Sequence, residues 1–234
     1  MGIAIVGVSE NGQASLLGTH TFEFTGWGFI TDLAANGNLV FVTAYSSGLR
    51  VLDTTNPANA TEVGSIDTGW FAWNVASKSN SVFVVDTANT MTVYNVSPSG
   101  TPTHVGTYNP MGYTYAVDVS GDYAYLYDNG DGMRVVNVSD PTHPVETTLY
   151  PFFNYSEGIP VDVKADSRYV YVADSQNLRK IDVLDPGNPV SVGQTSDSGE
   201  HLALYGSYGY AADRERELKI FNLSGSPTQI GAYT

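Results

Sequence analysis

The segment Tyr169-Val170-Tyr171-Val172-Ala173-Asp174 decides the fold of this sequence, because related segments occur five times along the chain. The equivalent first residues of the five copies lie 42, 42, 46 and 39 residues apart, at Leu39, Ser81, Tyr123, Tyr169 and Tyr208. A strand-containing repeat of about 40 residues is typical of stacked β-sheets in a propeller or an array. The period therefore predicts a protein built from copies of one small sheet.

Each repeat reads as four short strands, which are clearest at 161–164, 169–173, 178–183 and 190–193. Polar turns with glycine connect the second strand to the third. The third and fourth strands are separated by Asp-Pro or Asn-Pro, as at Asp185-Pro186, where proline removes a ladder donor. No segment shows apolar residues with the 3.6-residue period of a helix, so we expect an all-β propeller with essentially no helix.

The N-terminal segment differs from the rest, because it matches only the last two strands of a repeat. Residues 5–9 and 15–18 align with residues 51–55 and 61–64. We therefore expect a single β-propeller domain over residues 1–234, with five complete four-stranded blades and an N-terminal half blade. The expected half blade covers 1–25, and the blades cover about 26–68, 69–110, 111–152, 153–196 and 197–234.

Two arrangements of these blades are open. Five blades close with an appended hairpin, or six-bladed geometry forms with one blade incomplete. The first hairpin is in register with the repeat, which favours the six-bladed geometry. An incomplete blade also leaves an unpaired strand edge, which is a template for a strand of another chain.

The composition limits the classes of partner. Of 234 residues, 42% are hydrophobic, which is ample for a core, and 24 acidic against 10 basic residues give a net charge of -14. Such a charge repels phosphate backbones and anionic lipids, so neither nucleic acid nor a membrane surface is an expected partner. The chain has no cysteine, which excludes disulfides and thiolate metal sites. The apolar stretch at residues 1–8 is too short for a signal sequence or a membrane span.

The motifs of the fourth repeat resemble those of the LVIVD-repeat β-propellers. The resemblance lies in the segments 169–174, 178–183, 185–190 and 192–193, and it extends over nearly the whole chain. It implies the propeller fold and a place among secreted and surface proteins of bacteria and archaea, generally without an assigned reaction. The second repeat departs from the pattern at 97–100, where Ser-Pro-Ser-Gly replaces Asp-Pro, and the fifth departs at 214–217.

One side chain per repeat is expected at an equivalent place on the innermost strand, and these positions are Asp32, Asn74, Ala116, Asp162 and His201. The polar members of this ring have the oxygen and nitrogen atoms needed to hold a cation such as Ca²⁺ or a polar ligand in the central channel. The alternative is that each one bonds the backbone of the neighbouring blade. Ala116 interrupts the ring, which favours the structural interpretation, and we expect no other cofactor.

Two further sequence patterns, a turn rich in aspartate and glycine and a pair of glycosylation sequons, suggest a functional site. The turn Asp128-Asn129-Gly130-Asp131-Gly132 resembles a calcium loop but lacks the distal glutamate, and a hairpin turn needs the same residue types for backbone reasons. Asn59 and Asn154 stand in glycosylation sequons within expected loops, so they are candidate glycan attachment sites if the protein is exported.

Aromatic residues gather at the connections between successive blades. Trp70 and Phe71 occupy one connection, and Phe152, Phe153 and Tyr155 occupy the longest insertion. Loops at the rim of a propeller vary more freely than blades, so these side chains are candidates for an interaction face that stacks on sugars or on a protein. The alternative for the tryptophans, including Trp27 and Trp73, is packing between blades.

The sequence offers no catalytic residues. It contains no Gly-x-Ser-x-Gly elbow, and its four histidines lack metal-ligand spacing. We therefore expect a non-enzymatic extracellular binding or structural module that recognises a protein or a glycan. Self-assembly through the incomplete blade, by strand complementation, is one form of that function. The alternative is an enzyme or a cation-dependent ligand binder that uses the central channel.

Overall fold

A computed structural model describes residues 1–24, 26–110, 112–129, 131–151, 160–174, 176–196, 199, 201–212 and 217–233. The chain divides into two compact units, Met1–Gly106 (unit 1) and Thr107–Thr234 (unit 2), and each is described by itself. The expected single domain and its blade boundaries stay a prediction, as does the choice between five-bladed and six-bladed geometry.

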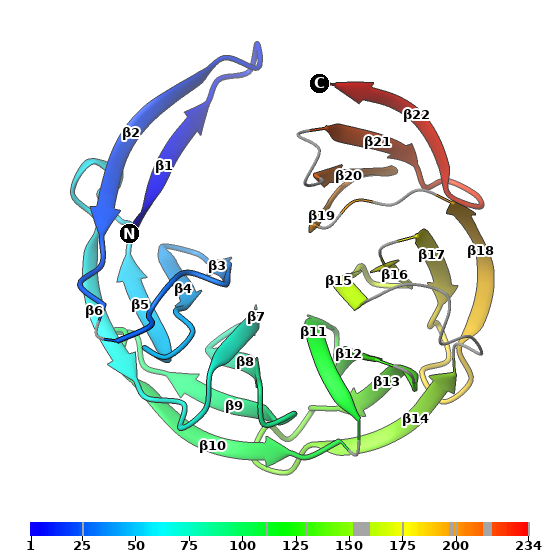
Figure 1. The fold of residues 1–234 in the computed structure, drawn as a ribbon, viewed down its shortest axis with the longest axis horizontal. Coiled ribbons are helices and arrows are strands. Elements are labelled where there is room, and N and C mark those ends of the chain that lie inside the picture. Colours follow the sequence, from blue (N-terminus) through cyan, green and yellow to red (C-terminus); the bar gives the residue numbers. More distant parts are fainter. Residues whose placement is uncertain are drawn as a thin grey trace. The chain divides into compact units, whose positions relative to one another are not determined.

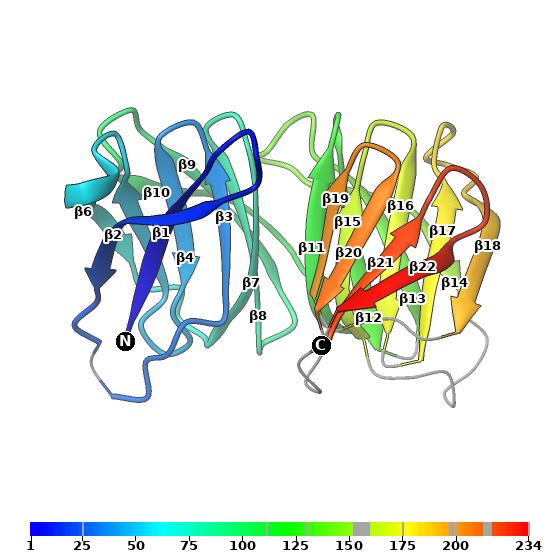
Figure 2. The same cartoon turned by 90° about the horizontal axis from the view of Figure 1, so that it is seen from above.

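Unit 1 contains a two-stranded hairpin followed by two four-stranded antiparallel sheets (Figures 1 and 2). The hairpin is β1 (Gly2–Val8) and β2 (Ala14–Thr21). The first sheet is β3 (Asp32–Asn36), β4 (Leu39–Thr43), β5 (Leu49–Asp53) and β6 (Thr61–Ile66), with a 3-10 turn η1 (Pro57–Asn59) before β6. The second sheet is β7 (Ala72–Lys78), β8 (Ser81–Asp86), β9 (Met91–Val96) and β10 (Pro102–Tyr108), whose last two residues belong to unit 2.

Unit 2 contains three more sheets of the same kind, each with its strands in sequence order. They are β11 (Tyr113–Ser120), β12 (Tyr123–Asn129), β13 (Gly132–Asn137) and β14 (Val145–Pro151); β15 (Pro160–Ala165), β16 (Tyr169–Asp174), β17 (Asn177–Asp182) and β18 (Val190–Ser196); and β19 (His201–Tyr205), β20 (Tyr208–Ala212), β21 (Leu218–Asn222) and β22 (Thr228–Tyr233). Neighbouring sheets of a unit lie with their first strands side by side, as β15 and β19 do (Figure 1).

The predicted all-β architecture is confirmed. The described strands form five four-stranded sheets and one hairpin, and the strands expected at 161–164, 169–173, 178–183 and 190–193 are β15 to β18. Within the described ranges, the structure has no helix of the length and apolar character needed to cross a membrane.

A bulge at one repeated position identifies the N-terminal hairpin as half of a sheet. The register between the third and fourth strands shifts after Val51 in β5, after Lys180 in β17 and after Ile220 in β21. In the hairpin the same shift follows Ile5 of β1, so β1 and β2 correspond to the third and fourth strands of a repeat, as the sequence predicts.

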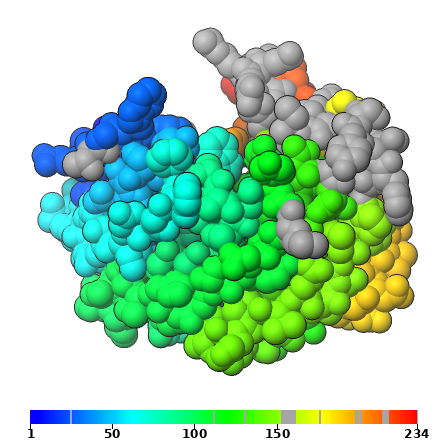
Figure 3. Space-filling view, turned by 60° about the horizontal axis from the view of Figure 1, so that its bottom comes forward, coloured from blue at the N-terminus to red at the C-terminus, as the bar shows by residue number. Residues whose placement is uncertain are grey.

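The core of each unit lies between the faces of successive sheets. In unit 1, Phe41 and Leu49 of the first sheet pack with Val75 and Val84 of the second, and Val42 on its opposite face packs against the hairpin. Unit 2 has equivalent clusters on both faces of the β15–β18 sheet. The segments of unit 1 form one continuous packed surface in the space-filling view (Figure 3).

A glycine in the fourth strand lets the next sheet approach closely. A Cβ atom built on Gly64 of β6 would overlap the carbonyl oxygen of Gly100, in the turn between β9 and β10. The same place in β2 is Gly18, which meets Pro57. In β18 it is Gly193, which meets Ser226. At these three places the fourth-strand glycine is the seat on which the outer turn of the following sheet rests, whereas Thr148 stands at the equivalent place of β14.

This contact predicts that Gly64→Ala destabilises unit 1. The new methyl group displaces the Gly100 carbonyl, and overpacking of this kind costs about 1–3 kcal/mol. Urea unfolding followed by circular dichroism measures the loss. The matched control is Gly225→Ala, whose Cβ would meet no atom within 4 Å. Equal stability of both variants would contradict the proposed role of the glycine seat.

Candidate functional site

Aromatic side chains from three segments of unit 1 meet on its surface. Phe29 follows β2, Tyr45 lies in the turn between β4 and β5, and Phe71 precedes β7. The Tyr45 ring is stacked between the other two, with centroids 4.6 Å from Phe29 and 4.3 Å from Phe71. Trp73 meets Tyr45 edge to face at 6.3 Å. Both arrangements are favourable for aromatic pairs, so the four rings form one cluster.

The backbone holds Tyr45 in an uncommon conformation. Its φ is 43°, in the left-handed region that costs a non-glycine residue about 1–3 kcal/mol. Two contacts fix the segment: the Tyr45 carbonyl accepts a hydrogen bond from the Ala72 amide at 3.0 Å, and the Thr31 hydroxyl donates to the Ala72 carbonyl at 3.0 Å. The packed connections around Tyr45 therefore maintain the strained residue that carries the central ring.

The cluster is open to solvent, and the connections that carry Phe29 and Phe71 each hold one more exposed tryptophan. Trp27 is 84% exposed, Trp70 is 62% exposed, and Phe71, Trp73 and Phe29 are exposed by 43%, 40% and 37%. We call these five residues together with Tyr45 the aromatic surface. A group of exposed apolar side chains of this size is more typical of an interaction site than of an ordinary surface.

The aromatic surface contains part of the predicted interaction face. Trp70 and Phe71 lie on it, whereas Phe152, Phe153 and Tyr155 lie outside the described residues. Phe29 and Tyr45 were not predicted, because their contacts depend on bringing together residues from separate connections.

The predicted channel residues take part in contacts between neighbouring sheets. In unit 1, the Asp32 carboxylate accepts hydrogen bonds from the Asn74 side chain at 2.6 Å and from the Val75 amide at 3.1 Å. In unit 2, Asp162 accepts one from the Leu202 amide at 2.8 Å and pairs with Lys164 at 3.0 Å. Each acid thus joins the first strand of its sheet to the first strand of the next.

The other members of the predicted ring do not make this contact in the same form. Ala116 is fully buried and carries no polar group, and two residues on, Asp118 accepts a hydrogen bond from the Ala165 amide at 2.7 Å. His201 is exposed in β19. Within the described ranges, no three His, Asp or Glu side chains are grouped closely enough to hold a metal ion. A calcium site in a channel formed by all these residues stays a prediction.

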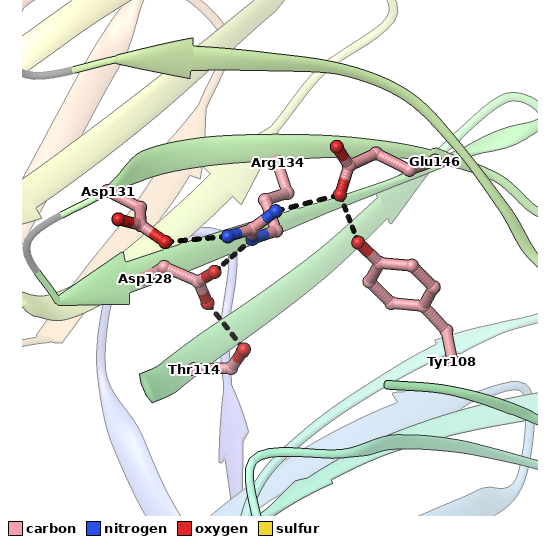
Figure 4. A network of polar contacts seen from close by, with 6 residues as sticks. All are labelled: Tyr108, Thr114, Asp128, Asp131, Arg134 and Glu146. Atoms are coloured by element: carbon pink, nitrogen blue, oxygen red, sulfur yellow. Dashed lines mark hydrogen bonds and ion pairs between the residues drawn. The ribbon is translucent and has the colours of Figure 1, made fainter. Parts of the chain in front are cut away.

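An arginine of β13 is ion-paired with the calcium-like turn of the third sheet (Figure 4). The Arg134 guanidinium contacts the carboxylates of Asp128, Asp131 and Glu146, the last two at 2.6 and 2.9 Å. Thr114 donates to Asp128, and Tyr108 donates to Glu146. Arg134 therefore supplies the positive charge between the two aspartates of the turn.

The environment shifts the pKa values of this network in opposite directions. Burial raises the pKa of Asp128, although hydrogen bonds from Thr114 and Arg134 act against it. Burial also acts to raise the pKa of Glu146, but the hydrogen bonds from Tyr108 and Arg134 outweigh it and lower the pKa below its usual value. The ionised form of Glu146 is thus favoured in the folded protein.

Of the two glycosylation candidates, the structure describes only one. Asn59 is exposed at the end of η1, where a glycan would have room, and its modification stays a prediction. Asn154 lies outside the described residues.

The LVIVD repeat model matches residues 28–68, 111–151, 157–197 and 198–234. The chain belongs to the LVIVD repeat family. The second repeat, at 69–110, is the one that the family model does not match, and it is also a repeat in which the sequence departs from the motif. Among curated proteins, none matches this chain.

Solved structures show the fold of these LVIVD repeats. A protein from Lactobacillus plantarum is 14% identical with a TM-score of 0.77, over 99% of this chain and 77% of that one. The β-propeller domain of Cps50 (Swd1) from Myceliophteria thermophila is 10% identical with a TM-score of 0.65, over 88% and 72%. A chain of a nidogen/laminin complex is 12% identical with a TM-score of 0.66, over 97% and 88%. The predicted β-propeller fold is confirmed, and it is a fold that suggests a protein-binding module.

Replacing Glu146 by glutamine should lower stability in a pH-dependent way. Because the folded-state pKa of Glu146 is lowered, its contribution is fully present above the unfolded value of 4.5 and is lost as the pH falls through the folded value. We expect Glu146→Gln to cost up to about 1 kcal/mol at pH 7 and less near pH 3. Urea unfolding at both pH values tests this, with Glu10→Gln in the exposed β1–β2 turn as control. A cost that does not change with pH would contradict it.

The contacts of Asp162 predict a structural effect that does not depend on calcium. Asp162→Ala leaves the buried Leu202 amide without its acceptor, which should cost about 1–3 kcal/mol. Thermal denaturation in calcium and in chelator measures it. A midpoint of the unmodified protein that rises with calcium, and no longer rises in Asp162→Ala, would instead support the cation site.

Proposed function

We propose that this protein is a non-enzymatic binding module whose aromatic surface takes up an apolar segment of a partner protein. The observation that carries the proposal is the stacked, solvent-exposed cluster of Phe29, Tyr45, Phe71 and Trp73. Aromatic residues are enriched at the energetic centres of protein interfaces, where they fill pockets of the partner. The strained φ of Tyr45 supports the proposal, since strain of this kind clusters at functional sites.

The chemistry of the three segments favours a protein over a glycan. The stretches 26–31, 44–48 and 69–73, which carry the aromatic rings, contain no charged residue, although Glu23 and Asp67 lie farther along the same connections. A sugar site combines ring faces with several convergent polar groups, whereas an apolar protein surface needs only a polar rim. In addition, both faces of the Tyr45 ring are covered by its neighbours, so that ring has no free face for a sugar. Glycan binding remains the second candidate through Trp27 and Trp70, which are the most exposed rings of the aromatic surface.

One neighbouring structure is consistent with a role in protein binding, because the matched chain comes from a structure described as a nidogen/laminin complex. The resemblance to secreted and surface proteins supports an extracellular or cell-surface location, which is part of the proposal.

Self-assembly is a further part of the proposal. β1 is the third strand of a repeat, yet in the described sheet it pairs only with β2, whereas β5, β13, β17 and β21 pair on both edges. Its sequence carries no charge or proline that would block strand addition. A strand of another copy therefore has an edge on which to pair.

The three tryptophans of the chain all belong to the aromatic surface, so selectively excited tryptophan emission reports on it, apart from the 16 tyrosines. The test screens the protein against a displayed peptide library and an oligosaccharide array. We expect apolar peptides to be selected, with a blue shift of tryptophan emission, and Phe71→Ala to weaken their binding about tenfold or more.

The matched control is Tyr205→Ala, which removes an aromatic side chain of 78% exposure in unit 2. It should leave peptide binding unchanged. Binding to sugars but not to peptides would replace the protein partner with a glycan. Selected peptides whose binding is insensitive to Phe71→Ala would overturn the proposed surface.

A further inference from the structure

Two exposed carboxylates accompany the tryptophans of the aromatic surface. Glu23 stands four residues before Trp27 in the connection between β2 and β3, and Asp67 stands three residues before Trp70 in the connection between β6 and β7. All four residues are exposed, and all belong to unit 1. Each of the two connections therefore presents one negative charge together with one indole ring.

A tight turn holds the Asp67 carboxylate close to Trp70. The Gly69 amide donates a hydrogen bond to Asp67 Oδ1 at 2.8 Å, and Gly69 has a φ of 78°, a conformation that suits glycine. The Thr68 hydroxyl donates to the Trp70 carbonyl at 2.6 Å. The turn uses one carboxylate oxygen, and within the described ranges Asp67 Oδ2 has neither a hydrogen bond nor an ion pair.

The connection between β2 and β3 brings Glu23 and Trp27 to one bend. Gly28 lies against Phe24, because a Cβ built on Gly28 would overlap the Phe24 side chain. Glu23 directly precedes one of these two residues, and Trp27 directly precedes the other. Among the residues that the structure describes, Glu23 has no ion pair.

The basic side chains of unit 1 have other positions. Unit 1 contains one arginine, Arg50, and one lysine, Lys78. The Arg50 guanidinium pairs with Glu62 at 2.9 Å and donates to the Ser47 carbonyl at 3.1 Å. Lys78 is the last residue of β7, roughly 20 Å along that strand from its start. Neither cation of the unit is therefore paired with the two carboxylates.

An indole ring together with a carboxylate is chemically suited to a cation. The negative face of an aromatic ring attracts ammonium and guanidinium groups, and tryptophan does so more strongly than tyrosine or phenylalanine. Arginine fits such a site best, because its flat guanidinium stacks on a ring while its N–H groups donate to a carboxylate. The net charge of -14 also attracts basic segments over a longer distance.

We propose that the partner segment bound by the aromatic surface carries basic residues, arginine above all, next to its apolar residues. The apolar residues pack on the stacked aromatic cluster, while guanidinium groups contact the two exposed tryptophans and pair with Glu23 and Asp67. This inference names the class of partner for the proposed function and rests on that function.

The displayed library of random peptides gives the first test. We expect the peptides that bind to be enriched in arginine and lysine relative to the unselected library. The strongest binder is then synthesised with arginine and again with citrulline at its basic positions, because citrulline keeps the shape of arginine without its charge. The arginine form should bind about tenfold more tightly in calorimetric titrations.

Two conservative variants assign this preference to the carboxylates. Asp67→Asn keeps an acceptor for the Gly69 amide, and Glu23→Gln keeps the size of the side chain, so both should retain the melting temperature. Each should weaken binding of the arginine peptide about threefold, and the double variant about tenfold, without changing the affinity for the citrulline peptide. The matched control is Glu10→Gln, which removes an exposed charge at the opposite end of β2 from Glu23 and should change neither affinity.

Salt provides an independent readout of the same contacts. Added sodium chloride screens exposed ion pairs, so it should weaken binding of the arginine peptide. The citrulline peptide, which is held by apolar contacts, should lose no affinity.

The outcomes separate this inference from the proposed function. Selected peptides without enrichment in basic residues, or equal affinities of the arginine and citrulline forms, would overturn the inference and leave the aromatic surface as a binding site. A preference for arginine that persists in the double variant would also overturn it, since the cations would then bind elsewhere. A library that yields no binding peptide would reject the proposed function itself, and the inference with it.

Discussion

The close approach between successive sheets is the constraint on which this structure depends. A fourth-strand glycine receives the outer turn of the next sheet, and apolar residues of both sheets fill the space between their faces. Because a Cβ at Gly64 would overlap the backbone of Gly100, the distance between these two sheets leaves no room for a larger residue at position 64. Buried side chains of the third strands therefore have close neighbours on the faces that lie between successive sheets of one unit.

Hydrogen bonds between the first strands of neighbouring sheets stabilise the same sheet-to-sheet contacts. Asp32 and Asp162 each accept an amide hydrogen bond from the following sheet, so residues with the chemistry of a ligand site serve the packing between sheets. Arg134 has a similar effect in the third sheet, where it neutralises carboxylates that would otherwise repel each other at the turn. Function is then most readily sought in the connections, where Tyr45 and Phe71 stack without a counterpart among the described residues of the other repeats.

The amino-acid sequence by itself determined the strands, their order and the half-sheet at the start, because a period of about 40 residues and the alternation of apolar residues are local properties. It also placed Trp70 and Phe71 at an exposed connection. Only the tertiary structure decided that Asp32 bonds the next sheet, that Arg134 lies between the aspartates of the calcium-like turn, and that Phe29 and Tyr45 join Phe71. These contacts join residues of different strands and connections, and a repeat pattern fixes which strands are neighbours but not which side chains meet.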